Sequence, residues 1–158
     1  MPSTRKNPRA SISKNDGRDA VYDKFIKGLT LAGIGLKSSM SRIDREEFFG
    51  VISQKGKKAF LVFTQEYNLA NMDEGSFDSE GSFRLTVAKS EKAEPALIIE
   101  CVFQAHMHSK NPEPDLAERF SHSEMRFVMV PFARQFVAGV TAQMAIPPVI
   151  VPLTTRAD

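Results

Sequence analysis

Residues 128–153 read VMVPFARQFVAGVTAQMAIPPVIVPL, and a change of hydrophobic spacing within this stretch decides the fold. Val130 precedes a proline, which disfavours the helical region, so an extended approach is expected to end there. Pro131 suits the first position of a helix. Large apolar residues then recur at intervals of four: Phe132, Phe136, Val140 and Met144. This spacing predicts an amphipathic helix over 131–145, which the paired prolines at 147 and 148 stop.

Upstream of this helix the apolar residues alternate, which is the period of a strand with one buried face. Four strands are predicted: 25–40, 59–72, a run through Phe83, Leu85 and Val87, and 96–109. The last two are separated by SEKAEP and are expected to form a hairpin. Three connecting segments are predicted: a connection at 41–58 with room for a short helical or extended piece, an exposed acidic loop at 73–81 and a turn-rich stretch at 110–124. The sequence therefore predicts the α+β class, with a four-stranded antiparallel sheet packed with one main C-terminal helix.

The composition is that of a single soluble globular domain, because 42% of the 158 residues are hydrophobic and 25% are charged. Residues 1–20 are basic and contain almost no large apolar side chain, so we expect a disordered arm there, then the domain at 21–153 and a tail at 154–158. The arm has no apolar core segment, so we do not expect it to be a secretory signal. We expect a cytoplasmic protein without membrane insertion.

Few residues suggest chemistry. His106 and His108 alternate onto one face of the fourth strand, where Glu100, Asp115 or His122 could complete a metal site. An ordinary solvated face is the favoured interpretation, so no metal is predicted. Cys101 alternates with apolar neighbours and is predicted to be buried. Burial would raise the pKa of its thiol and make it a poor nucleophile. Phosphate-binding loops and nucleophile elbows are absent from the sequence, so neither a cofactor nor an enzymatic activity is predicted.

Residues 127–153 resemble the C-terminal signature of the SecB export-chaperone family, in which a strand leads through an apolar-Pro-aromatic-Ala-Arg segment into a helix and a proline-containing crossover loop. The segment FRLTVAKSEKAEPALIIECVF, residues 83–103, is similar to the hairpin between that family's third and fourth strands. The resemblance implies a four-stranded sheet backed by helix and a tetramer assembled as a dimer of dimers. It also implies apolar grooves that hold non-native polypeptide without ATP.

The resemblance also assigns roles to residues of this chain. The crossover loop corresponds to 146–153, and six side chains are the expected polypeptide-binding wall: Phe103, Phe127, Ile146, Val149, Ile150 and Val151. The apolar helix residues are expected to be shared between sheet packing and the oligomer interface: Phe132, Phe136, Val140 and Met144. Many weak apolar contacts along one chain gain affinity through effective concentration, which suits capture of varied clients.

Two departures from the family pattern narrow the expected function. The chain stops at Asp158, where the family continues into a second helix and an acidic tail, so a more open groove is expected. The formal net charge is +2, which argues against docking to the SecA motor. The acidic residues that gather at 66–80 could form a docking face for a basic partner, although ordinary solvation is the favoured interpretation. We therefore expect binding of one dedicated client, such as an antitoxin, in preference to a role in general protein export.

Two other functions are weighed against the chaperone. A nucleic-acid-binding sheet could use the basic arm and exposed Phe residues, although no aromatic RNA-reading motif is present. An enzyme of sheet-plus-helix architecture is the third reading, but no general base can be named for it. Capture of non-native polypeptide remains the preferred prediction.

Overall fold

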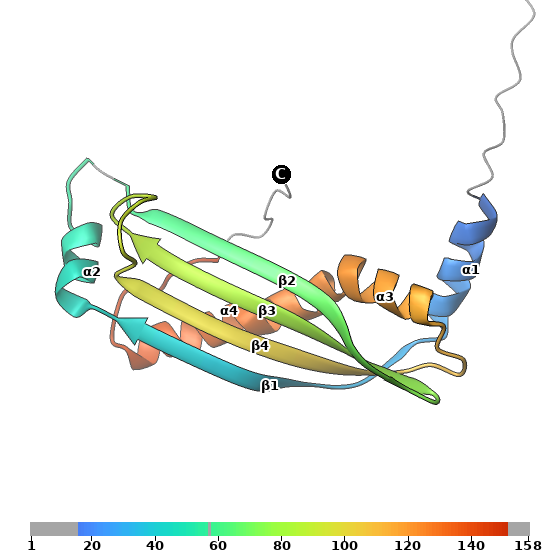
Figure 1. The fold of residues 1–158 in the computed structure, drawn as a ribbon. Helices are drawn as coiled ribbons and strands as arrows, with labels where there is room; N and C mark the ends of the chain where they lie inside the picture. Colours follow the sequence, from blue (N-terminus) through green and yellow to red (C-terminus); the bar gives the residue numbers. More distant parts are fainter. Residues whose placement is uncertain (1–15, 57, 152–158) are drawn as a thin grey trace, which may run out of the picture.

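The computed structural model describes residues 16–56 and 58–151. Eight elements follow one another along the chain: α1 Asp16–Lys27, β1 Thr30–Ile43, α2 Arg45–Ile52, β2 Phe60–Asp73, β3 Ser76–Ala88, β4 Leu97–His108, α3 Pro114–Ser123 and α4 Met125–Gln143. The strands form one antiparallel sheet in the order β1-β4-β3-β2. Figure 1 shows α4 crossing behind this sheet, α2 at one end and α1 with α3 at the other. The predicted α+β class and the hairpin of β3 with β4 are confirmed.

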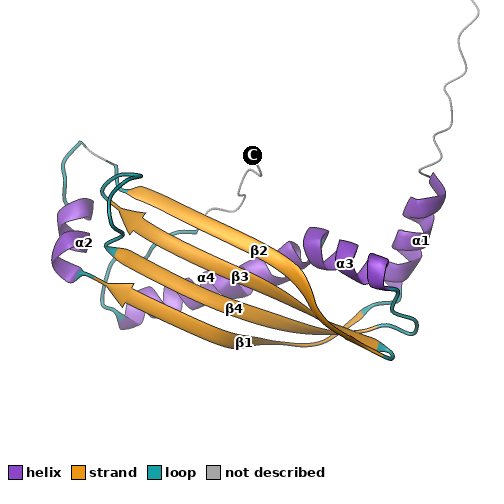
Figure 2. Cartoon of the chain, in the orientation of Figure 1, coloured by secondary structure: helices purple, strands orange, loops and turns teal. Residues whose placement is uncertain are grey.

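The sheet has one buried and one uncovered face because its central strands alternate apolar and polar residues. On β4 Leu97 is buried on the inner side together with all five side chains predicted to be inward: Ile99, Cys101, Phe103, Ala105 and Met107. They face α4, and in Figure 2 no helix of the described ranges crosses the front of the sheet. The core divides lengthwise into two clusters, one toward α1 and α3 and one toward α2.

The acidic segment 73–81 is mostly strand, so its prediction as a loop is wrong. Only Glu74 and Gly75 form the turn, and β3 already starts at Ser76, which pairs with Asp73. Gly75 has a φ of 85°, a conformation that glycine adopts without a steric penalty and that closes the hairpin tightly. Ser76, Asp78 and Glu80 alternate onto the uncovered face of β3, which is why this segment looked loop-like in the sequence, whereas Ser79 faces the helices.

The main helix begins six residues earlier than predicted, because α4 starts at Met125 and contains Pro131 in its interior. The predicted extended approach to Pro131 is therefore wrong. A proline there leaves the carbonyl of Phe127 without its helical partner, and both residues are exposed, so water can satisfy that carbonyl. The buried stripe also differs by one position from the predicted one: Met125, Met129, Ala133, Val137 and Thr141.

The stretch predicted as turn-rich contains the helix α3, which has Pro114 in its first turn. Ala117 and Phe120 on its buried face pack into the core. A buried pair of hydroxyls joins this helix to the sheet, because Ser79 and Ser121 lie 2.6 Å apart and Ser121 donates to the Ala117 carbonyl at 2.9 Å. Proline-rich composition concealed the helix, whose polar positions are simply its exposed face.

The N-terminal part of the described chain also departs from the prediction. Residues predicted as the start of the first strand lie in α1, where Tyr22 and Phe25 are buried. Residues 16–20 of the expected disordered arm are helical, and residues 1–15 lie outside the described ranges. In contrast, the short helical piece allowed for the connection at 41–58 is present as α2, whose first turn is capped by the Asp44 carboxylate accepting the Glu47 N–H at 3.0 Å.

Candidate functional site

The end of the sheet nearest α2 carries exposed apolar side chains around a buried cluster. Phe48 and Val51 of α2 are 1% and 4% exposed and pack with Leu97 and Ile99 of β4. Their helix neighbours Phe49 and Ile52 point outward and are 41% and 40% exposed. We call the exposed and half-buried apolar residues here the α2-end surface: Phe49, Ile52, Leu61, Val149 and Ile150.

The crossover loop reaches this surface because α4 ends in a tight reversal. The Ile146 N–H donates to the Thr141 carbonyl at 3.2 Å and the Ala145 N–H to the Ala142 carbonyl at 3.0 Å, the two bonds of a Schellman ending. Ala145 takes the left-handed conformation that this ending requires, with a φ of 51°. Arg45 of α2 donates to the Met144 carbonyl and so joins the two elements.

The predicted polypeptide-binding residues are not gathered on one wall. Ile146 and Val151 are buried in the α2-end cluster, whereas Ile150 between them is 82% exposed and Val149 is half-buried. Their assignment to polypeptide binding stays a prediction, and only the exposed members can touch a client directly in this conformation. The α2 residues Phe49 and Ile52 were not predicted, although their spacing of three in REEFFGVI is typical of a helix face.

The two aromatic residues of the predicted polypeptide-binding wall lie away from the α2-end surface. Phe103 is 6% exposed, and its ring centre is 6.2 Å from that of Phe132 and 6.3 Å from that of Phe136. Phe127 is 66% exposed, stands under the Arg126 guanidinium at 4.6 Å, and lies near the start of α4 rather than at its loop end. Phe103 is therefore a core residue of the single chain, and Phe127 is a separate exposed aromatic.

The predicted oligomer residues form one flank of α4, beside its buried stripe. Three of them are half-buried against the core: Phe136, Val140 and Met144. Phe132 is 38% exposed. β1 is the edge strand that pairs with β4, and along its opposite side no strand of the described ranges pairs with it. Leu31 and Leu36 on that edge are 42% and 47% exposed.

Paired charges, in contrast, occupy the uncovered face of the sheet. Arg84 and Glu100 lie 2.6 Å apart, and Lys37 pairs with Glu80. Asp78 lies 2.6 Å from His106 Nδ1 and accepts from Gln104 Nε2 at 3.1 Å. Two members of the acidic group suggested as a docking face, Asp78 and Glu80, are therefore already engaged within the chain.

Comparison with solved structures identifies the fold. The chain is similar to the Mycobacterium tuberculosis Rv1957 SecB-like chaperone, solved in complex with a ChAD peptide from the Rv1956 HigA1 antitoxin. The TM-score is 0.65 at 16% sequence identity, and the match covers 86% of this chain and 98% of that chain. The chain has the SecB-like fold. The fold that the sequence resemblance implied is therefore confirmed.

Other comparisons add little to this result. A protein of unknown function from Streptococcus agalactiae matches with a TM-score of 0.45 and 12% identity, over 79% of this chain and 97% of that chain, a likeness too slight to bear on function. No protein-family model matches the sequence. No curated protein matches it either.

Within this SecB-like fold, the residues considered for chemistry are placed as follows. His106 and His108 share one face, as predicted, with ring centres 4.9 Å apart. Across 16–56 and 58–151, no group of three or more His, Cys, Asp or Glu residues could hold a metal ion. Cys101 is 2% exposed, and burial raises the pKa of its thiol to about 11, as the sequence predicted in direction.

Two further observations bear on the alternatives. The inward-facing rings of the central strands are buried, including Phe77 and Phe83, so they offer no stacking platform for bases. Among the helices that the structure describes, none combines the length and the apolar character needed to cross a membrane.

Proposed function

We propose that this protein is an ATP-independent holdase chaperone that binds non-native polypeptide through its α2-end surface. The observation that carries the proposal is a set of exposed apolar side chains on the SecB-like fold, led by Phe49 and Ile150. The proposed role is binding rather than catalysis, because capture of a polypeptide needs exposed apolar area and does not need an activated nucleophile.

Physical chemistry favours such a surface for capturing varied segments. The exposed side chains are aromatic or aliphatic and make no hydrogen-bond demand on what they touch. Their chain neighbours Phe48, Val51 and Val151 are buried in one cluster, which fixes the backbone that carries them. A client therefore meets a surface that is already formed, which lowers the entropy lost on binding. The exposed Phe127 is a further contact along α4.

We propose one dedicated client rather than general export. The neighbour of the same fold was solved with a peptide from an antitoxin, which supports a polypeptide client of that kind. The net charge of +2 disfavours docking to an acid-binding motor such as SecA. The single cysteine, free and buried, suits the reducing cytoplasm, where we place this activity.

We further propose that the chain works as a homo-oligomer. The support is the open edge of β1 together with the apolar flank of α4, since long exposed edges and apolar patches normally find a partner. A tetramer built as a dimer of dimers, as the SecB resemblance implies, would cover both.

Light scattering of an aggregating client tests the proposed activity. The wild-type protein is expected to suppress aggregation of a chemically denatured client at about one oligomer per client, without ATP. The double variant Phe49→Asp, Ile150→Asp is expected to suppress it at least about fivefold less efficiently, because two charges enter the apolar surface. Phe60→Asp is the matched control, since Phe60 is 39% exposed and its alternation places it on the uncovered face.

Two results would contradict the proposal. Wild-type protein that leaves aggregation unchanged at tenfold excess would remove the holdase activity itself. Equal suppression by the double variant and by Phe60→Asp would remove the α2-end surface as its location. Circular dichroism of each variant checks that the fold is retained.

A further inference from the structure

The end of the molecule opposite the α2-end surface contains an apolar cavity, to which none of the comparisons assigns a role. A cavity of about 510 Å³ lies between α1 and the segment that joins β4 to α3. Its apolar lining is Val21, Phe25 and Leu116, and Val21 is 52% exposed, which is high for an aliphatic side chain. The hollow is thus large enough for a bulky side chain and is open to solvent.

Contacts between α1 and α3 hold the walls of this cavity. The Tyr22 hydroxyl lies 3.1 Å from Ser123 Oγ, and the Arg119 guanidinium stands 3.9 Å above the Tyr22 ring. The Phe25 ring is stacked at 6.1 Å on Phe77 of β3. On the other wall, the Ser109 N–H donates to the Gly75 carbonyl at 3.0 Å. These contacts preform the hollow, so a ligand does not have to organise it.

The rim of the cavity carries unpaired positive charge. Lys24 and Lys110 line it and are exposed, and within the described ranges neither forms an ion pair with a carboxylate. Glu113 also belongs to the lining, which therefore has one more positive than negative group. An apolar floor beside two available ammonium groups favours a ligand that combines an apolar group with a carboxylate.

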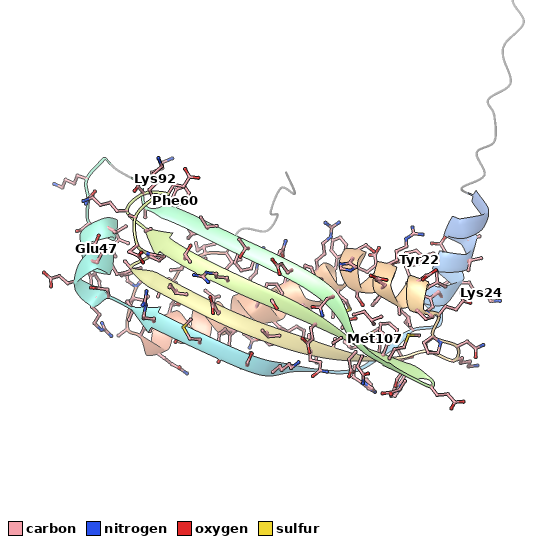
Figure 3. All side chains as sticks on the ribbon, viewed as in Figure 1. Tyr22, Lys24, Glu47, Phe60, Lys92 and Met107 are labelled. Carbon is pink, nitrogen blue, oxygen red and sulfur yellow. The ribbon has the colours of Figure 1, made fainter. Side chains whose placement is uncertain are left out.

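This cavity is well separated from the α2-end surface. Figure 3 shows Tyr22 and Lys24 at one end of the sheet and Glu47, Phe60 and Lys92 at the other. The strands between them contain 12 to 14 residues, a span of about 40 Å at roughly 3.3 Å per residue. One extended client of about a dozen residues could therefore contact both ends, and two linked contacts bind more tightly than either alone.

We propose that the α1–α3 cavity is a second docking site, which takes a client segment where a large apolar side chain is flanked by acidic residues. This inference rests on the proposed holdase function and specifies the client further. The apolar side chain enters between Val21, Phe25 and Leu116. The flanking carboxylates pair with Lys24 and Lys110, so the site selects among clients that the α2-end surface alone would accept.

Fluorescence anisotropy with two labelled octapeptides tests this site. Both have one central Phe in a Ser/Gly background, flanked by two Glu residues in one peptide and by two Gln residues in the other. An octapeptide spans about 26 Å, too short to reach both ends. The Glu peptide is expected to bind wild-type protein at least about threefold more tightly, and added salt is expected to remove that advantage.

Charge reversal locates the effect. The double variant Lys24→Glu, Lys110→Glu is expected to abolish the preference for the Glu peptide. The double variant Lys24→Arg, Lys110→Arg is expected to keep the preference. Lys92→Glu, at the far end of the sheet, is expected to leave it unchanged. Phe49→Asp, Ile150→Asp is also expected to retain the preference, so loss of aggregation suppression and loss of acidic-peptide selection are separate results. Equal affinity of the two peptides for wild-type protein would overturn the site. An unaltered preference for the Glu peptide in Lys24→Glu, Lys110→Glu would overturn it too. A parallel assay with vesicles of anionic lipid would also overturn it if the protein bound the vesicles and neither peptide.

Discussion

At the scale of single residues, Gly81 sets how closely the helix layer approaches the sheet. A Cβ added at Gly81 would lie 2.5 Å from Met129 Sδ and 3.2 Å from Tyr67 Cδ1. Met129 is fully buried on the inner stripe of α4, so its sulfur has little room to move. Because Gly81 has no side chain, the side chain of Met129 on α4 can fill the space above β3 at this point.

We expect Gly81→Ala to lower the free energy of unfolding by about 1–3 kcal/mol, because the methyl group overpacks this contact. Urea denaturation followed by circular dichroism measures the change. Gly139→Ala is the matched control, since nothing outside its own helix lies within 4 Å of a Cβ added there. That substitution should be neutral or stabilise by up to about 1 kcal/mol. Equal effects at the two glycines would contradict the packing account.

Cys101 is expected to make stability depend on alkaline pH. Burial raises the pKa of its thiol from 9.0 to about 11, so between these values the unfolded chain ionises while the folded chain keeps its proton. The contribution is fully present below pH 9 and is lost as pH rises toward 11. Urea denaturation of wild type and Cys101→Ala at pH 8, 9 and 10 measures it. The variant should be less stable at pH 8 but show a shallower decline, and parallel declines would contradict the assignment.

At the scale of elements, the end of α4 controls where the crossover loop goes. The reversal at Ala145 turns the chain back so that Ile146 and Val151 enter the core beside α2. The paired prolines predicted to stop the helix follow this reversal, and the helix itself ends at Gln143. A left-handed alanine is less favourable than a left-handed glycine because its Cβ crowds the carbonyl.

Ala145→Gly should therefore raise the free energy of unfolding by about 1 kcal/mol. Thermal and urea denaturation measure the gain. The control is Ala142→Gly, one turn earlier in the regular helix, which should cost about 0.5–1 kcal/mol because glycine is a poor helix former there. A loss of stability in Ala145→Gly would show that the left-handed turn is not the ending of α4.

At the scale of the whole molecule, three apolar surfaces lie in different places: the α2-end surface, the α1–α3 cavity, and the α4 flank with the open edge of β1. Figure 1 shows α2 at one end of the sheet and α1 with α3 at the other, so the first two places lie far apart. The third runs along its length, so it suits another copy of the chain, while the ends stay available to a client. This division separates assembly from client binding.

Phe132→Asp should shift the protein to a smaller assembly, because it places a charge on the exposed member of the α4 flank. Size-exclusion chromatography with light scattering measures the mass. Gln135→Asp, also exposed on α4, is the control and should leave the mass unchanged. A wild-type monomer at about 50 μM would contradict oligomerisation, since a specific interface of ordinary size holds at that concentration.

The hydropathy of the sequence determined the sheet, the inward side of β4 and the presence of a C-terminal helix, because alternation and four-residue spacing are local properties of the chain. The sequence alone placed Asp78 and Glu80 in a loop and Pro131 at a helix start, since polar strands and interior prolines break local rules. Tertiary packing decided these cases: β4 pairs with β3 through Asp78, and core contacts of Met125 and Met129 hold α4 helical across the proline.

The candidate site divides in the same way. The crossover loop was recognisable from its residues, and Ile150 was correctly placed on it. Which of its side chains are buried depends on α2, more than ninety positions earlier in the chain, through contacts such as the bond from Arg45 to the Met144 carbonyl. Local patterns carry no information about contacts so distant in sequence. The sequence therefore determined which elements exist, and only the tertiary structure decided which of their apolar residues face water.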